Sequence, residues 1–80
     1  MVYEKIVEII CNEFDREPGE MTEDSTFVGD LGLDSVDVVE LAMELETEFG
    51  LTSDIPEEEL KKIVTIGDLA KYIRDNTGLE

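Results

Sequence analysis

The sequence that decides the fold is Leu31-Gly32-Leu33-Asp34-Ser35-Val36, where a glycine-containing loop passes into a helix. A stripe of apolar residues at helical spacing predicts that this helix covers residues 35–49, with Gly50 as a suitable C-cap. The free N–H groups and the positive dipole end at a helix start favour an anion. Ser35 is therefore either an ordinary N-cap, a role that Asp34 can also fill, or an attachment point for a phosphorylated group. The stripe consists of Val38, Leu41, Ala42, Leu45 and Phe49.

Helical spacing also predicts a first helix over residues 2–16, ended by Pro18-Gly19. Residues 17–34 are expected to form a long loop, an uncommon and often functional feature in a compact domain. Three apolar residues of the loop are expected to dip into the core. The helix stripe is Tyr3, Ile6, Val7, Ile10 and Phe14, and the loop residues are Phe27, Val28 and Leu31.

Two further helices are predicted in the C-terminal part. Pro56 suits the start of a short helical segment over residues 57–62. Thr65 and Asp68 form a variant of the capping box, with Thr65 as the cap and Asp68 reaching back. The last helix has the stripe Ile66, Leu69, Ala70 and Ile73 and ends near Asn76 and Gly78. We therefore expect a single all-α domain over residues 1–80, a small four-helix bundle of three longer helices and one short helix.

The composition limits the partners. The 80 residues carry 22 acidic and 6 basic side chains, a formal net charge of −16, with no Lys or Arg between Arg16 and Lys61. Such a surface repels nucleic acid and anionic lipid headgroups and attracts basic patches on proteins. Neither a signal peptide nor a membrane span is evident, so a cytoplasmic location is expected. We also expect a monomer. Cys11 is the only cysteine and is expected to be a small core residue.

The predicted helix 35–49 carries a second apolar stripe, opposite its core stripe. Its three residues, Val36, Val39 and Met43, are bordered by carboxylates. One interpretation is chance exposure, or cover by the segment that follows the helix. The other is a docking face, on which apolar contacts supply affinity and carboxylates steer a basic partner. The carboxylates are Asp37, Glu40, Glu44 and Glu48, with Glu46 on the other flank.

Catalysis by Ser35 itself is excluded, because the chain has no histidine to act as its base. If Ser35 reacts, another enzyme must carry out the chemistry. We therefore expect a protein that is not an enzyme.

Several stretches together resemble the acyl carrier proteins of discrete, fatty-acid-synthesis type. The likeness covers nearly the whole chain and rests on the combination, since Asp-Ser-(Leu or Val) alone is a weak signal. Two features depart from the usual pattern: Val36 replaces the commoner leucine, and Gly50-Leu51-Thr52-Ser53-Asp54 is slightly longer. The stretches are residues 27–37, Val39-Glu40-Leu41, Glu46-Thr47-Glu48-Phe49, Ile55-Pro56-Glu57-Glu58-Glu59, Lys62-Ile63, Thr65-Ile66-Gly67-Asp68 and Tyr72-Ile73.

This resemblance implies a function. Ser35 would carry 4′-phosphopantetheine, moved from coenzyme A by a phosphopantetheinyl transferase, and Asp34 would contact the transferase and its metal ion. The thiol of the arm would hold acyl chains as thioesters for the enzymes of fatty acid biosynthesis, whose basic patches would dock on the protein. No metal site of the protein's own is implied. The docking residues would be Val36, Asp37, Val39, Glu40, Met43, Glu44 and Glu46.

Three alternatives stay open at this stage. The first is a specialised carrier for polyketide, nonribosomal peptide or lipid-modification chemistry. The second is an acidic interaction module without an arm. The third is a calcium-binding loop, because Asp24 and Gly29 match positions one and six of an EF-hand. That match then fails, since Val28 occupies a ligand position and Ser35 replaces the bidentate glutamate.

Overall fold

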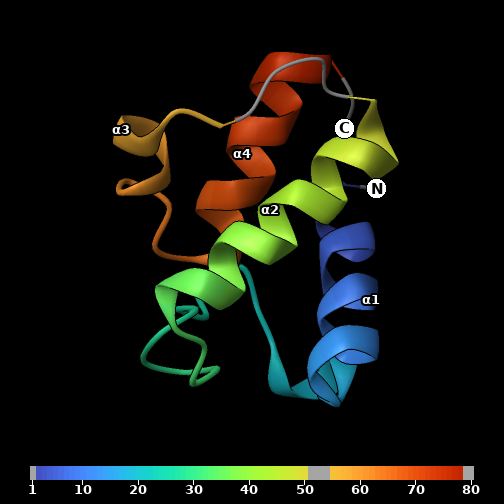
Figure 1. The fold of residues 1–80 in the computed structure, drawn as a ribbon. Coiled ribbons are helices and arrows are strands. Elements are labelled where there is room, and N and C mark those ends of the chain that lie inside the picture. The colour runs from blue at the N-terminus through green and yellow to red at the C-terminus, as the bar shows by residue number, and fades with distance from the viewer. Residues whose placement is uncertain (1, 51–54, 79–80) are drawn as a thin grey trace.

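Four α-helices and one short 3-10 turn make up the fold in a computed structural model that describes residues 2–50 and 55–78. The elements are α1 (Val2–Phe14), η1 (Pro18–Glu20), α2 (Ser35–Phe49), α3 (Glu57–Leu60) and α4 (Ile66–Thr77). In the view of Figure 1, α2 crosses in front of α4, with α1 on one side and the short α3 on the other. The predicted all-α bundle of three longer helices and one short helix is confirmed.

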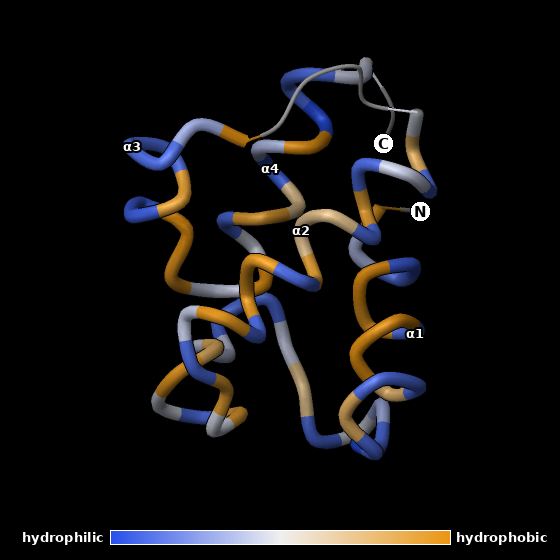
Figure 2. Tube along the Cα trace, in the orientation of Figure 1, coloured by the Kyte–Doolittle hydropathy of each residue, from blue (hydrophilic) through white to orange (hydrophobic). Residues whose placement is uncertain are grey.

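The core forms where the apolar stripes of α1, α2 and α4 meet. Ile6 and Ile10 of α1, Leu45 of α2 and Leu69 and Ile73 of α4 are fully buried. Along these helices apolar stretches recur between polar ones, as Figure 2 shows. All four stripe residues predicted for α4 are buried, and the α2 stripe is buried except Phe49, which packs partly exposed against the core. Burial of these stripes is the main stabilisation expected for so small a bundle.

The ends of two helices differ from the prediction. α1 ends at Phe14 rather than residue 16, because Asp15 has a φ of 56°, in the left-handed region that a helix cannot continue through. Pro18 and Gly19 lie inside η1 instead of ending α1. α3 ends at Leu60 rather than residue 62, since the chain tightens there into i→i+3 bonds such as Lys62 N–H to the carbonyl of Glu59 (3.0 Å).

The predicted caps are confirmed. Gly50 and Gly78 follow α2 and α4 with φ values of 69° and 76°, the left-handed conformation that suits glycine at a helix end. Thr65 and Asp68 form the predicted capping box of α4, with the Asp68 N–H donating to Oγ1 of Thr65 (3.0 Å). Cys11 is partly buried at the margin of the core. The predicted longer segment continues from Gly50 into residues 51–54, which lie outside the described residues.

The long connection from α1 to α2 is tied to the start of α4. The Phe27 N–H donates to the carbonyl of Val64 (3.0 Å), and the N–H groups of Ile66 and Gly67 donate to carbonyls of residues 25 and 23 (3.0 and 2.8 Å). Thr26 and Thr65 form an isolated antiparallel β-bridge. The described residues contain no β-strand. This connection is therefore a packed part of the fold.

The prediction for one residue of this connection, that it lies in the core, was wrong. Phe27 and Leu31 are buried as expected, but Val28 is 68% exposed. The chain turns over residues 26–30, where the Asp30 N–H donates to the carbonyl of Thr26 (3.2 Å) and a carboxylate oxygen of Asp30 accepts from the Thr26 N–H (2.8 Å). Val28 stands at the tip of this turn, so its side chain projects outward.

Candidate functional site

Ser35 is the first residue of α2, and Asp34, not Ser35, is the N-cap. The two residues of the capping box bond reciprocally: the Asp37 N–H donates to Oδ1 of Asp34 (2.9 Å), and the Asp34 N–H donates to Oδ2 of Asp37 (3.1 Å). Ser35 is exposed, and within residues 2–50 and 55–78 no group hydrogen-bonds its hydroxyl. Ser35 is therefore not the N-cap, because Asp34 fills that role; its hydroxyl is accessible, and attachment of a phosphorylated group at Ser35 stays a prediction.

The position of Ser35 suits a covalently attached phosphate. The first N–H groups of an α-helix have no partner inside the helix, and the helix dipole adds partial positive charge at the same end. A phosphate joined to the first residue of the 15-residue α2 lies beside both. The residues present therefore fit a phosphodiester at this position.

Three features fix the conformation of the loop that precedes Ser35. Gly32 has a φ of 68°, which glycine adopts without strain. The N–H of Leu33 donates to the carbonyl of Phe27 (2.9 Å), which holds the turn against the core. The guanidinium of Arg16 donates to the carbonyl of Leu31 (2.7 Å). No role for Arg16 was predicted, although its isolation in an acidic stretch is visible in the sequence.

The second apolar stripe of α2 is exposed. Val36, Val39 and Met43 have exposed fractions of 63%, 39% and 58%. The short α3 lies to one side of α2 in Figure 1. The exposed fractions of the three side chains show that α3 does not cover the stripe. The described part of the segment that follows α2 does not cover the stripe, so that interpretation is wrong for these residues.

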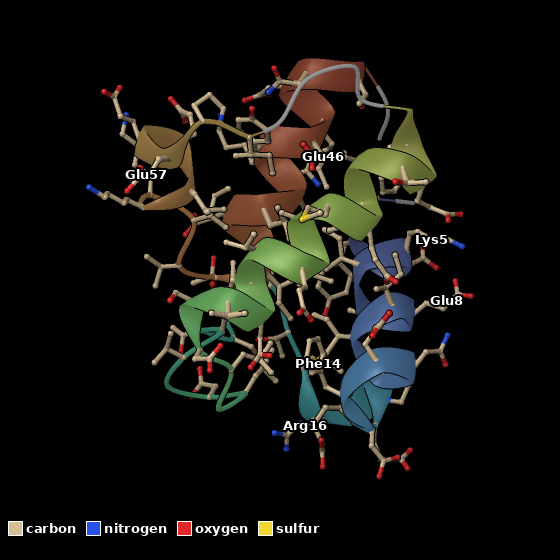
Figure 3. The ribbon with its side chains drawn as sticks, viewed as in Figure 1. Lys5, Glu8, Phe14, Arg16, Glu46 and Glu57 are labelled. Atoms are coloured by element: carbon tan, nitrogen blue, oxygen red, sulfur yellow. The ribbon has the colours of Figure 1, made fainter. Side chains whose placement is uncertain are left out.

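The predicted docking carboxylates differ in accessibility. Glu40 and Glu44 are exposed, whereas Asp37 is half-buried and bonded to the helix cap. Glu46 is also half-buried and lies between α2 and α4 in Figure 3. Burial raises the pKa of Tyr72 on α4, and the negative charges of Glu59 and then Glu46 add to the rise. Glu46 therefore faces α4 more than it faces solvent.

Neither a cluster of metal-ligating side chains nor a membrane-crossing helix is found in the described part of the chain. No group of three or more His, Cys, Asp or Glu side chains is arranged to hold a metal ion there. Within residues 2–50 and 55–78, no helix has the length and apolar character that crossing a bilayer requires.

Comparison with known proteins decides the family. A family model described as the phosphopantetheine attachment site matches residues 4–73. The chain belongs to the acyl carrier protein family. It is 45% identical over 75 residues to an acyl carrier protein of Wolinella succinogenes, a match that covers 94% of this chain and 96% of that protein. An acyl carrier protein of Helicobacter pylori strain G27 is also 45% identical over 75 residues, covering 94% of each chain.

The fold agrees with this assignment. A solved structure of the acyl carrier protein from Enterococcus faecalis, described for its high thermal stability, superposes with a TM-score of 0.76 at 40% identity. The match covers 94% of this chain and 92% of that one. As an acyl carrier protein, the chain is a non-catalytic carrier whose cofactor is covalent phosphopantetheine. The chain's lack of histidine, noted from the sequence, agrees with that role.

Proposed function

We propose that Ser35 carries the 4′-phosphopantetheine arm and that the protein presents acyl thioesters to the enzymes of fatty acid synthesis. The observation that carries this proposal is the exposed, unbonded hydroxyl at the first residue of α2. It belongs to a chain whose residues 4–73 match the attachment-site family. The arm, when bound, supplies a terminal thiol that holds acyl groups as thioesters.

Loading requires an external enzyme. The oxygen of Ser35 forms a phosphodiester with the phosphopantetheine phosphorus of coenzyme A, and the pyrophosphate bond of coenzyme A breaks. The hydroxyl proton leaves to a base of the transferase, and adenosine 3′,5′-bisphosphate is the leaving group. This chain offers no histidine as that base. Its own contribution is position: Asp34 fixes the helix start and lies exposed beside Ser35, where it can contact the transferase and the metal ion that the transferase holds.

Docking of partner enzymes is assigned to the exposed face of α2. Val36, Val39 and Met43 offer apolar contact close to the arm, and Glu40 and Glu44 offer negative charge beside them. Charge of this kind accelerates encounter with a basic surface and loses strength over a Debye length of about 8 Å at physiological ionic strength. Association is therefore expected to be fast, weak and salt-sensitive, which allows one carrier to visit several enzymes in turn.

The loading test uses mass. The chain is incubated with coenzyme A, Mg²⁺ and a promiscuous phosphopantetheinyl transferase, and the intact protein is weighed. We expect a gain of one phosphopantetheine group in the natural chain and none in Ser35→Ala. Ser25→Ala is a poor control because Ser25 is buried, so the control is Thr47→Ala, which removes an exposed hydroxyl further along α2 and should load as fully as the natural chain. Loading that persists in Ser35→Ala contradicts the assignment.

The pathway test uses the loaded protein. A malonyl transferase and a condensing enzyme of fatty acid synthesis should charge and extend the arm, because the pattern of α2 resembles the carriers of that pathway. Extension is followed by mass. Loading without malonyl transfer or extension would favour a specialised carrier and would contradict the fatty-acid assignment, while leaving Ser35 as the attachment residue.

A further inference from the structure

A groove of about 500 Å³ runs along α1 beside η1. Its volume lies within the roughly 300–1,000 Å³ of clefts that hold ligands. Val7 is buried at its floor, and Tyr3 and Cys11 are half-buried beside it. The groove therefore presents an apolar floor to solvent within a border of exposed, largely polar side chains. The border residues are Glu4, Glu8, Asn12 and Pro18.

This groove faces away from α2. On the same stretch of α1, Nζ of Lys5 forms an ion pair with Glu48 of α2 at 3.0 Å, so Lys5 marks the side of α1 that is turned to α2. Successive residues of an α-helix are about 100° apart, which turns Tyr3 and Val7 about 160° away from Lys5. Glu8 projects outward from α1 in Figure 3. A partner in the groove therefore leaves the exposed face of α2 free for an enzyme.

Hydrogen bonds at one end fix the shape of the groove. The hydroxyl of Tyr3 donates to the carbonyl of Met21 (3.2 Å), and the N–H of Met21 donates to the carbonyl of Pro18 (3.3 Å). Met21 is buried in the core, so these bonds hold η1 against α1. A groove whose walls are fixed in advance binds a partner without further ordering of this part of the chain, which favours affinity.

Negative charge surrounds the apolar floor. Burial first, and then the charges of Glu17 and Glu20, raise the pKa of the Cys11 thiol above its ordinary value, so this thiol is uncharged at pH 7. The two carboxylates of the border add to the negative charge. No basic side chain occurs among the described residues that line the groove, and Lys5 meets it only through an ion pair with Glu8 (3.5 Å). The groove therefore favours a ligand with positive charge around an apolar centre.

We propose that this groove binds an amphipathic helix of a partner protein. Apolar side chains of that helix lie on Tyr3, Val7 and Cys11, and its Lys or Arg side chains face the surrounding carboxylates. This surface goes beyond the carrier function, because binding here needs neither Ser35 nor the exposed face of α2. Charge selects the occupant: a second copy of the chain brings the same net charge of −16, and a fatty acid brings a further carboxylate.

A helix suits the groove better than an extended segment. The residues of α1 that line the groove extend from position 3 to position 12, about 14 Å at the ~1.5 Å rise per residue of an α-helix. That length matches about two to three turns of a partner helix, whose apolar anchors recur at positions i, i+3 or i+4 and i+7. Addition of a partner strand requires an unpaired sheet edge, and the described residues contain no β-strand to offer one.

The first experiment uses Cys11 as a reporter. The full chain with Ser35→Ala is used, so that no phosphopantetheine thiol is added and Cys11 stays the only cysteine. Iodoacetamide alkylates this thiol with and without a synthetic amphipathic helix of leucine and lysine, about three turns long. At about ten times its Kd the peptide should slow alkylation about tenfold, because only unoccupied protein reacts. The same peptide with glutamate in place of lysine should give no protection.

Matched variants locate the bound peptide. Asn12→Lys puts a positive charge at the border of the groove and should raise the Kd of the peptide about two- to fivefold, the range for one exposed charge pair. Asn76→Lys makes the same change at an exposed position of α4, and Glu44→Lys reverses a charge on the exposed face of α2. Both should leave protection of Cys11 unchanged. Equal protection in Asn12→Lys and Asn76→Lys, or loss of protection in Glu44→Lys, would overturn the proposal.

The second experiment maps the contact directly. The ¹⁵N-labelled natural chain is titrated with the leucine–lysine peptide, and the backbone amides of residues 3–12 should shift at lower peptide concentration than those of residues 35–44. The reverse order would place the peptide on α2 and contradict the proposal. Protection of Cys11 by sodium dodecanoate, or protection that grows with the concentration of the chain without peptide, would assign the groove to a fatty acid or to a second copy and equally contradict it. Neither experiment requires loading of Ser35, so their outcome is independent of the proposed carrier function.

Discussion

Arg16 and Leu31 are joined across the long connection by a hydrogen bond of 2.7 Å from Nη2 of the guanidinium to the carbonyl oxygen. Arg16 lies just beyond α1, in the lower part of Figure 3, and Leu31 lies four residues before the start of α2. The bond therefore fixes the distance between the end of one helix and the approach to the next. It also places one of the chain's six basic side chains beside the segment that leads to Ser35.

Arg16→Ala should destabilise the protein by about 1 kcal/mol, because a hydrogen bond from a charged donor is lost while the carbonyl regains only water. The measurement is urea denaturation followed by circular dichroism. Lys61→Ala is the control, since it removes one exposed positive charge and so matches the change in net charge. An equal loss in both variants would mean that charge alone, and not the bond to Leu31, is responsible.

Asp68→Asn should destabilise the protein at pH 7 by about 1 kcal/mol, the usual cost of weakening a helix cap. The pKa of Asp68 lies below its ordinary value of 3.8, first because the Thr65 N–H donates to its carboxylate and also because the Val64 N–H does so. A lowered pKa gives stability that is present above pH 3.8 and lost as the pH falls through the folded-state value.

Stability measured at acidic pH tests this predicted pH dependence. Denaturation midpoints measured from neutral pH down to about pH 3 should fall less steeply in Asp68→Asn than in the natural protein. Asp24→Asn is the control, because Asp24 is an exposed aspartate outside the cap. Parallel curves for the natural protein and Asp68→Asn would rule out this linkage.

Glu44→Gln should raise the melting temperature at pH 7. The pKa of Glu44 is raised by its hydrogen bond with Glu13, so its contribution to stability is fully present below pH 4.5 and is lost as the pH rises through the folded-state value. A neutral amide removes the repulsion that the ionised group meets at pH 7. Calorimetry from about pH 4.5 to neutrality should show a shallower decline in the variant. Glu58→Gln controls for net charge, and an equal rise in both variants would contradict the local explanation.

Gly67→Ala should destabilise the protein by about 1–3 kcal/mol, even though alanine normally strengthens a helix. A Cβ atom at Gly67 would lie 2.9 Å from the carbonyl oxygen of Glu23, which also accepts the Gly67 N–H at 2.8 Å. The backbone on both sides would have to separate. Gly19→Ala is the matched control because nothing lies within 4 Å of its Cβ position. Chemical denaturation measures both, and a neutral Gly67→Ala would disprove the close packing.

Local signals predicted much of this structure. The cap residues Gly50, Thr65 and Gly78 mark helix ends through chemistry that acts within a few residues, and the stripes predicted the core because burial follows the 3.6-residue period. The exposed face of α2 followed from the same geometry. The resemblance to a family then supplied Ser35 as a site, which the residues alone left balanced between a cap and an attachment point.

The remaining features depend on contacts between distant residues. The outward turn of Val28 follows from bonds between Thr26 and Asp30, and the early end of α1 follows from the conformation of Asp15. No local pattern pairs Glu13 with Glu44, because 31 positions separate them and only the crossing of α1 and α2 brings them together. For this reason the sequence did not predict this pairing, although both carboxylates are visible in it.

The bonds between residues 23–27 and the start of α4 bear on how this protein can be engineered. A stretch without helix or strand is the usual choice for inserting a tag or varying chain length, since such stretches commonly tolerate it. Here three backbone bonds and the bridge between Thr26 and Thr65 set the register of that stretch against α4. A single added residue would break the match at every bonded pair, so length changes in this stretch should behave like damage to the hydrophobic interior.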